Sequence, residues 1–136
     1  MKTNLFIALI LIVCTFSACK DEKAEEKAQL TEVLKVHDEV MGKSETAVKN
    51  KIIIDSLIKY QNPDTAKSAR LAVLDKQLNT ASEEMENWMH TFNPDYTGKS
   101  HAEVMEYLHS QRLKLLKVDS LMKVAISQSN DYLKTK

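Results

Sequence analysis

Apolar residues recur every three or four positions from Leu30 onward, and two proline-containing breaks divide this pattern into three stripes. Such spacing places the side chains on one face of an α-helix. The pattern predicts a first helix over residues 24–61, which ends because the residue before Pro63 is disfavoured in a helix. The stripe of this helix contains Leu30, Val33, Leu34, His37, Val40, Met41, Ser44, Ala47, Val48, Lys51, Ile54 and Ile58, with Ile52 and Leu57 beside it.

The second and third stripes predict helices over residues 64–92 and 101–134. The second stripe alternates strictly between steps of three and four, as in a coiled coil. The third helix opens with Ser100 and Glu103 at the spacing of a capping box. The second stripe is Leu71, Leu74, Leu78, Ala81, Met85, Trp88 and Phe92, and the third is Val104, Leu108, Gln111, Leu115, Val118, Met122, Ala125, Ser129 and Tyr132.

Short connections between these helices predict an all-α fold, an elongated up-down-up antiparallel three-helix bundle over residues 30–136. Helices of about thirty to thirty-eight residues would be roughly 45 to 57 Å long, so the bundle is expected to be a slender rod. Leftover apolar positions such as Ile53 and Leu113 are available for pairing between chains, which makes a homo-oligomer one expectation.

The first eighteen residues have the features of a secretory signal peptide. Lys2 supplies the positive start, and the apolar run from Leu5 to Phe16 follows it. That run is shorter than the roughly twenty residues that cross a bilayer as a helix. We therefore expect residues 1–18 to be a leader and not a permanent membrane span.

Phe16, Ser17, Ala18 and Cys19 resemble the lipobox of bacterial lipoproteins. The resemblance implies cleavage before Cys19, a diacylglycerol on its thiol and usually acylation of the new amino terminus. The protein would then be held on the membrane by lipid, with residues 19–29 as a lipidated tether or a frayed helical stem. The alternative is an ordinary secretory signal with a cysteine close to the cut.

Lys20, Asp21 and Glu22 follow the cysteine directly. They resemble the export signal of Bacteroidota-type lipoproteins, which implies the outer membrane and favours its surface face over its periplasmic face. The alternative is a charged, solvated linker.

Composition narrows the classes of function. Lys and Arg together number 19, as do Asp and Glu, so no basic surface suggests a nucleic-acid partner. Cys14 lies in the expected leader and Cys19 would be lipidated, which leaves no thiol for a disulfide, a metal or catalysis.

Folding the helices back on each other predicts that residue 37 lies level with residue 88, and residue 88 level with residue 105. Imidazole and thioether groups are ligands for copper, and a His-Met pair also binds haem. The alternative is that methionines fill the helix core while histidines end the stripes, and we assign no cofactor and no metal ligand. The membrane-proximal residues concerned are His37, Met41, Met85, Trp88, Met89, His90, His101, Met105 and His109.

We find no catalytic residue and do not expect an enzyme. Glu106 and His109 match one Glu-x-x-His motif, whereas a di-iron bundle needs two such motifs and two more glutamates. Asp38 and Glu39 beside His37 lack a nucleophile or an oxyanion donor nearby.

Residues 36–41 (VHDEVM) and 87–89 (NWM), followed by a long last helix, resemble small uncharacterised lipoproteins of Bacteroidota-type bacteria. Some of these are labelled viral A-type inclusion proteins, and the family brings no known activity. The sequence therefore indicates a lipid-anchored structural or protein-interaction module whose protein partner it does not identify. The alternative is a small copper- or haem-binding envelope protein that uses the His/Met residues.

Overall fold

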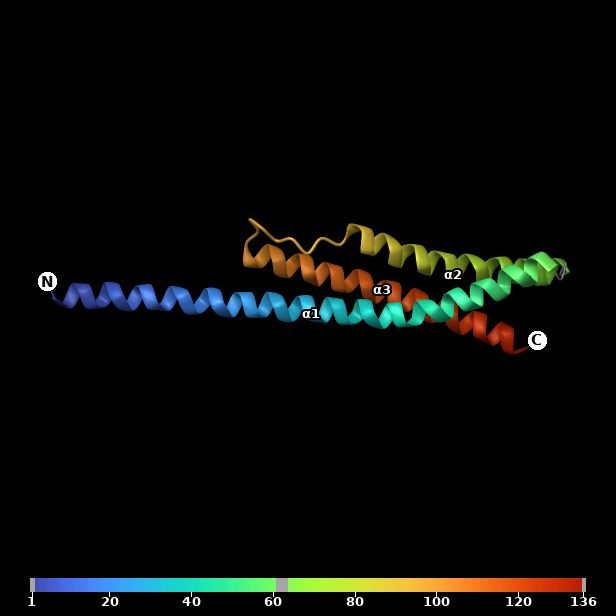
Figure 1. The fold of residues 1–136 in the computed structure, drawn as a ribbon, viewed down its shortest axis with the longest axis horizontal. Coiled ribbons are helices and arrows are strands. Elements are labelled where there is room, and N and C mark those ends of the chain that lie inside the picture. The colour runs from blue at the N-terminus through green and yellow to red at the C-terminus, as the bar shows by residue number, and fades with distance from the viewer. Residues whose placement is uncertain (1, 61–63, 136) are drawn as a thin grey trace.

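The described residues fold into an all-α bundle of three helices, as predicted, and they contain no strand (Figure 1). The computed structural model describes the backbone of residues 2–60 and 64–135 and the side chains of residues 21–60, 64 and 66–135. The helices run up, down and up, so that α1 and α3 are parallel and α2 lies antiparallel to both. Their bounds are Lys2–Tyr60 for α1, Thr65–Thr91 for α2 and His101–Lys134 for α3.

Local side-chain contacts explain where α2 and α3 begin. The Asp64 carboxylate accepts a hydrogen bond from the Lys67 backbone N–H at 2.9 Å and caps α2. Ser100 and Glu103 form the predicted capping box of α3, because each side chain accepts a hydrogen bond from the other residue's backbone N–H. After α2, Phe92 has extended backbone angles of −69° and 123°, and the connection of residues 92–100 is not helical.

One apolar core runs along the bundle, and α2 and α3 contribute the faces predicted for them. Every member of the second and third stripes is buried except Phe92 and Tyr132, which are half-buried. Even the polar members Gln111 and Ser129 lie inside, at 4% and 0% exposure. Both stripe predictions are thus confirmed.

The buried face of α1 differs from its predicted stripe. Val33, Val40, Ala47 and Ile54 follow one another at seven-residue intervals and are all at most 1% exposed. By contrast, the predicted core positions of the outer column (Leu34, Met41 and Val48) are 41%, 40% and 50% exposed. Their predicted burial is wrong.

Contacts with both neighbours explain this difference. His37 and Lys51 on α1 reach α2, where they contact Trp88 and Asp75. Lys43, three residues after Val40, reaches α3. The buried face is therefore centred between these two sides, and the outer column, one residue after each core position, falls outside it.

Buried polar contacts tie α1 to α3. The Asn50 side chain donates hydrogen bonds to Ser129 Oγ and Asn130 Oδ1, both at 2.8 Å. About two helical turns earlier on α1, Lys43 Nζ donates to Asp119 Oδ1 at 2.8 Å. Because Asn50 and Ser129 are 6% and 0% exposed, a shift of one helix along the other would leave polar groups buried without partners. These contacts therefore specify the register of the parallel pair.

Leu115 and Leu113 offer a matched test of the core. Leu115 is fully buried, whereas Leu113 is 52% exposed two residues away on the same helix. We expect Leu115→Ala to lower the free energy of unfolding by about 2–5 kcal/mol, because it removes core contacts and leaves a cavity. Leu113→Ala should change it by less than about 0.5 kcal/mol. Urea unfolding of dilute protein checks both, and equal losses would contradict this assignment of the core.

Asp119 makes the stability of the bundle dependent on pH. Burial alone would raise the pKa of this carboxyl, but hydrogen bonds from Lys123 and Lys43 outweigh burial and lower it. A lowered pKa in the folded state means that the ionised pair stabilises the fold above the ordinary carboxyl pKa of about 3.9. That contribution is lost as the pH falls through the lower pKa of the folded state.

We therefore expect Asp119→Asn to lower the free energy of unfolding at pH 7 by about 1–3 kcal/mol. The difference from the unmodified protein should shrink as the pH falls below about 4. Chemical unfolding across this pH range measures it. Asp131→Asn, at an exposed position of the same helix, is the control. A difference that persists at acidic pH would refute the ion-pair explanation.

Candidate functional site

The expected anchor lies partly outside the described residues. The side chains of Cys19 and Lys20 are not among those described, so lipidation and the export signal stay predictions. Asp21 and Glu22 are exposed on α1. Residues 19–29, expected as a tether or a frayed stem, are helical and continue directly into the bundled part of α1 (Figure 1).

His101 joins this stem to the start of α3. Its Nδ1 lies 3.1 Å from Glu26 Oε1 and its Nε2 lies 3.5 Å from Glu25 Oε2. Glu26 is only 7% exposed, and Lys23 donates to its other oxygen at 2.8 Å. The hydrogen bond from Lys23, followed by that with His101, lowers the pKa of the Glu26 carboxyl against the opposing effect of desolvation. The bundle thus begins at this level of α1.

The predicted register is right between α1 and α2 and wrong between α2 and α3. The His37 and Trp88 rings lie 5.5 Å apart, which confirms that residues 37 and 88 are level. The rings of Phe92 and Tyr107 lie 6.2 Å apart, and the Asn93 backbone N–H donates to Tyr107 Oη at 2.8 Å. Residue 88 is therefore level with about residue 111, not with residue 105. The extended connection carries the chain further along the rod than a tight turn would.

This register separates the histidines. His101 is level with Glu26, and His37 lies eleven residues further along α1, which corresponds to about 16 Å. His90 and His109 are exposed, and His90 lies 3.6 Å from Glu86 on its own helix. Within the described part of the chain, no group of three His, Cys, Asp or Glu residues is placed to hold a metal ion. The His and Met residues that we expected to lie together are thus spread along one end of the rod.

A chain of aromatic contacts links all three helices at this end. From His37 and Trp88 it continues through Phe92, whose ring lies 4.7 Å from that of Trp88, to Tyr107 and then to Tyr96 at 5.9 Å. Trp88 and Phe92 are members of the second stripe four residues apart, but their contact with Tyr107 depends on the extended connection. Periodicity could therefore identify the pair of Trp88 and Phe92, but not the contact of Phe92 with Tyr107.

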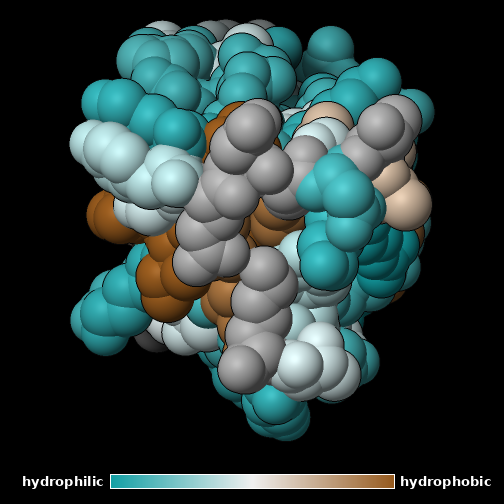
Figure 2. All heavy atoms as spheres, turned by 90° about the vertical axis from the view of Figure 1, so that its right-hand side faces the viewer, coloured by the Kyte–Doolittle hydropathy of each residue, from teal (hydrophilic) through white to brown (hydrophobic). Residues whose placement is uncertain are grey.

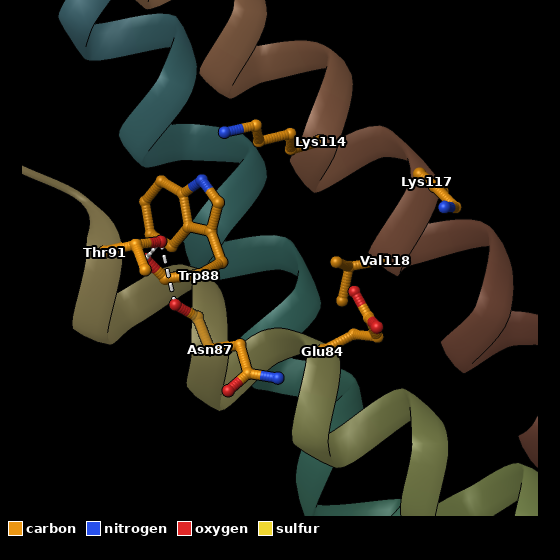
Figure 3. Close-up of a pocket in the computed structure, with 7 residues that line it drawn as sticks. All are labelled: Glu84, Asn87, Trp88, Thr91, Lys114, Lys117 and Val118. Carbon is orange, nitrogen blue, oxygen red and sulfur yellow. Dashed lines mark hydrogen bonds between the residues drawn. The ribbon is translucent and has the colours of Figure 1, made fainter.

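A cavity beside this aromatic chain lies between α2 and α3 and has a volume of about 260 Å³. Figure 3 shows the Trp88 indole with α1 behind it and Lys114 and Lys117 projecting from α3. The Thr91 hydroxyl is already bound to the Asn87 and Trp88 carbonyl oxygens, so it is not poised as a nucleophile. The lining is Glu84, Asn87, Trp88, Thr91, Lys114, Lys117 and Val118.

Two buried polar atoms at this level make no hydrogen bond within the described residues. They are Nε1 of Trp88, a donor, and Oε1 of Gln111, an acceptor. Trp88 and Gln111 are level in the register given above. None of the described side chains that line this cavity forms a nucleophile-and-base pair.

Among the described residues, no helical segment is long and apolar enough to cross a bilayer. Comparisons with protein-family models, curated proteins and solved structures find no match.

His101 and His90 provide a test of how the stem is attached. We expect His101→Ala to increase proteolysis and hydrogen exchange over residues 21–29, because it removes the contact of α3 with Glu25 and Glu26. His90→Ala should leave the stem unchanged, because its only described ion pair is with Glu86 on the same helix. Exchange mass spectrometry of both variants checks this, and an unchanged stem in His101→Ala would contradict the proposed attachment.

Proposed function

We propose that this protein is a lipid-anchored envelope lipoprotein whose helical rod serves as a structural or protein-interaction module. The observation that carries the proposal is the run Phe16, Ser17, Ala18 and Cys19 after a short apolar leader. Acyl chains on Cys19 would hold the protein firmly, because each buried methylene contributes about 0.8 kcal/mol and two or more chains anchor stably.

The proposed address is the outer membrane. Lys20, Asp21 and Glu22 favour its surface face over its periplasmic face, by their resemblance to an export signal. A helical stem after Cys19 suits this address, since it would carry the rod away from the lipid. The near-neutral charge gives no reason for a nucleic-acid partner.

Surface chemistry favours an interaction role over catalysis. The hairpin end of the rod presents hydrophobic residues in the middle of a largely hydrophilic face (Figure 2). Near this end, Ile52, Ile53 and Ile58 of α1 are 60%, 46% and 42% exposed. Contiguous exposed apolar patches mark sites that bind other macromolecules, and we propose that these three residues contribute to one. A rod held at its other end would offer this hairpin and its sides to a partner.

Cys19→Ser tests the anchor. We expect the unmodified protein to carry acyl mass on Cys19 and to enter the detergent phase in Triton X-114 partitioning. Cys19→Ser should lack that mass and remain in the aqueous phase or keep its leader. Cys14→Ser, within the expected leader, is the matched control and should behave as the unmodified protein does. Intact mass spectrometry reads the modification directly, and a Cys19→Ser chain that stays lipidated would overturn the proposal.

A further inference from the structure

We propose that the rods associate side by side, with the outer face of α3 of one copy seated in the groove between α1 and α2 of the next copy. This inference deepens the proposed function by naming the partner as a second copy of the chain, and it rests on that function for the common orientation of the rods. Two surfaces carry it, one acidic and one basic.

The acidic groove lies between α1 and α2 and has a volume of about 420 Å³. Its apolar lining includes Met41 and Val48 of the outer column together with Met89 of α2, which is 43% exposed. Leu34, the first member of the outer column, lines a neighbouring hollow on α1. Carboxylates flank this apolar part. Glu86 lines the groove and lies 3.6 Å from His90, which also lines it. Asp38 shares the hollow beside Leu34 with Lys35, and Glu45, a helix neighbour of Met41 and Val48, pairs with Lys49 at 2.7 Å. The acidic groove is thus defined by Leu34, Met41, Val48, Met89, Asp38, Glu45 and Glu86.

The basic ridge lies on α3, from its outer side to the edge that it shares with α2, and consists of Leu113, Lys114, Lys117 and Val124. Leu113 and Val124 are 52% and 49% exposed, and steps of four and seven residues place them on one face with Lys117. Neither Lys114 nor Lys117 makes an ion pair with a described residue. Asp119, the one carboxylate in this stretch, is buried and bound to Lys43 and Lys123. Glu84 of α2 lines the same cavity as these two lysines without forming an ion pair with them. The ridge therefore presents two lysines without an ion-pair partner among the described residues, beside apolar groups.

The two surfaces lie at the same height along the rod. Because Lys43 binds Asp119 and both helices rise equally per residue, residues 113–124 of α3 are level with about residues 37–48 of α1. The outer column covers residues 34–48. Two parallel rods anchored in one membrane plane therefore bring the acidic groove and the basic ridge together without an axial shift.

The surfaces lie on different sides of the molecule, so the contact is heterologous. Each copy keeps one free surface, which leads to a ring or to an open row in the membrane plane. Tethering to a surface favours such a contact, because it replaces dilute collision by a high effective concentration. Opposite charges flanking the apolar groups would select this pairing over the pairing of two like surfaces.

Disulfide trapping in the full chain, in its own envelope, tests the contact. One population carries Val48→Cys in the acidic groove and the other Val124→Cys on the basic ridge, each with a distinguishable tag. Under mild oxidation we expect the mixed 48–124 disulfide to exceed either same-residue disulfide at least fivefold. Predominant 48–48 or 124–124 products would overturn the heterologous arrangement. Trapping of Val48→Cys on a protein of different mass in place of the second copy would overturn the occupant.

Charge reversal separates docking from chance collision. Lys114→Glu with Lys117→Glu in the ridge copy should lower the mixed disulfide at least fivefold. Adding Asp38→Lys and Glu86→Lys in the groove copy should restore it, which a mere folding defect would not allow. Lys99→Glu with Lys134→Glu makes the same change in charge at exposed positions beyond the two ends of the ridge and should have no effect. A mixed disulfide that ignores the ridge reversal would overturn the proposal.

Intact mass measured on the same samples distinguishes this inference from the proposed function. Acylated Cys19 without the mixed disulfide would overturn the self-association and leave the anchor standing. The mixed disulfide without acylation would uphold the contact between acidic groove and basic ridge and overturn the anchor.

Discussion

The parallel pairing of α1 and α3 is the constraint on which the rest of the structure depends. Three polar contacts hold it along its length, at Glu26 with His101, at Lys43 with Asp119 and at Asn50 with Ser129. Each includes at least one group that is less than a tenth exposed, so each would cost free energy if its partner moved away. Apolar side chains drive the association of the helices, but they tolerate sliding, whereas these contacts tolerate only one register.

The same contacts decide which side of α1 faces inward. α1 carries two adjacent apolar columns, the buried one that begins at Val33 and the outer column that begins at Leu34. Turning α1 by one residue would bury the outer column, but it would also draw Lys43 away from Asp119 and leave this buried carboxylate with Lys123 as its only described cation. The polar contacts thus select between two faces of similar hydrophobicity. As a result, an ordered row of apolar groups stays on the surface.

The sequence was sufficient for the fold class, for the stripes of α2 and α3 and for the capping box at Ser100. It was insufficient for α1, because Val40 with Met41 and Ala47 with Val48 are neighbouring apolar pairs that periodicity cannot rank. Polar residues that reach α3, such as the half-buried Lys43 and the buried Asn50, interrupt the hydrophobic pattern even though they specify the pairing. The path of residues 92–100 depends on the tertiary contact of Phe92 with Tyr107, which local propensity does not encode. That one contact moves α3 by several residues and spreads the histidines.

At the end of the rod near Glu26, α2 is absent and α1 packs against α3 and the connection, whereas the middle of the rod contains all three helices. This difference affects how an anchor on α1 would act on the rod. α2 ends at Thr91, roughly level with residue 35 of α1 in the register set by His37 and Trp88. Below that level α1 packs against α3 and the extended connection, with His101 binding Glu26 where the bundle begins. A tilt imposed on the stem would therefore act first on the parallel α1–α3 pair, whose polar contacts fix its register. Because the acidic groove includes α1 and the basic ridge lies on α3, both would keep the same height and orientation in every anchored copy.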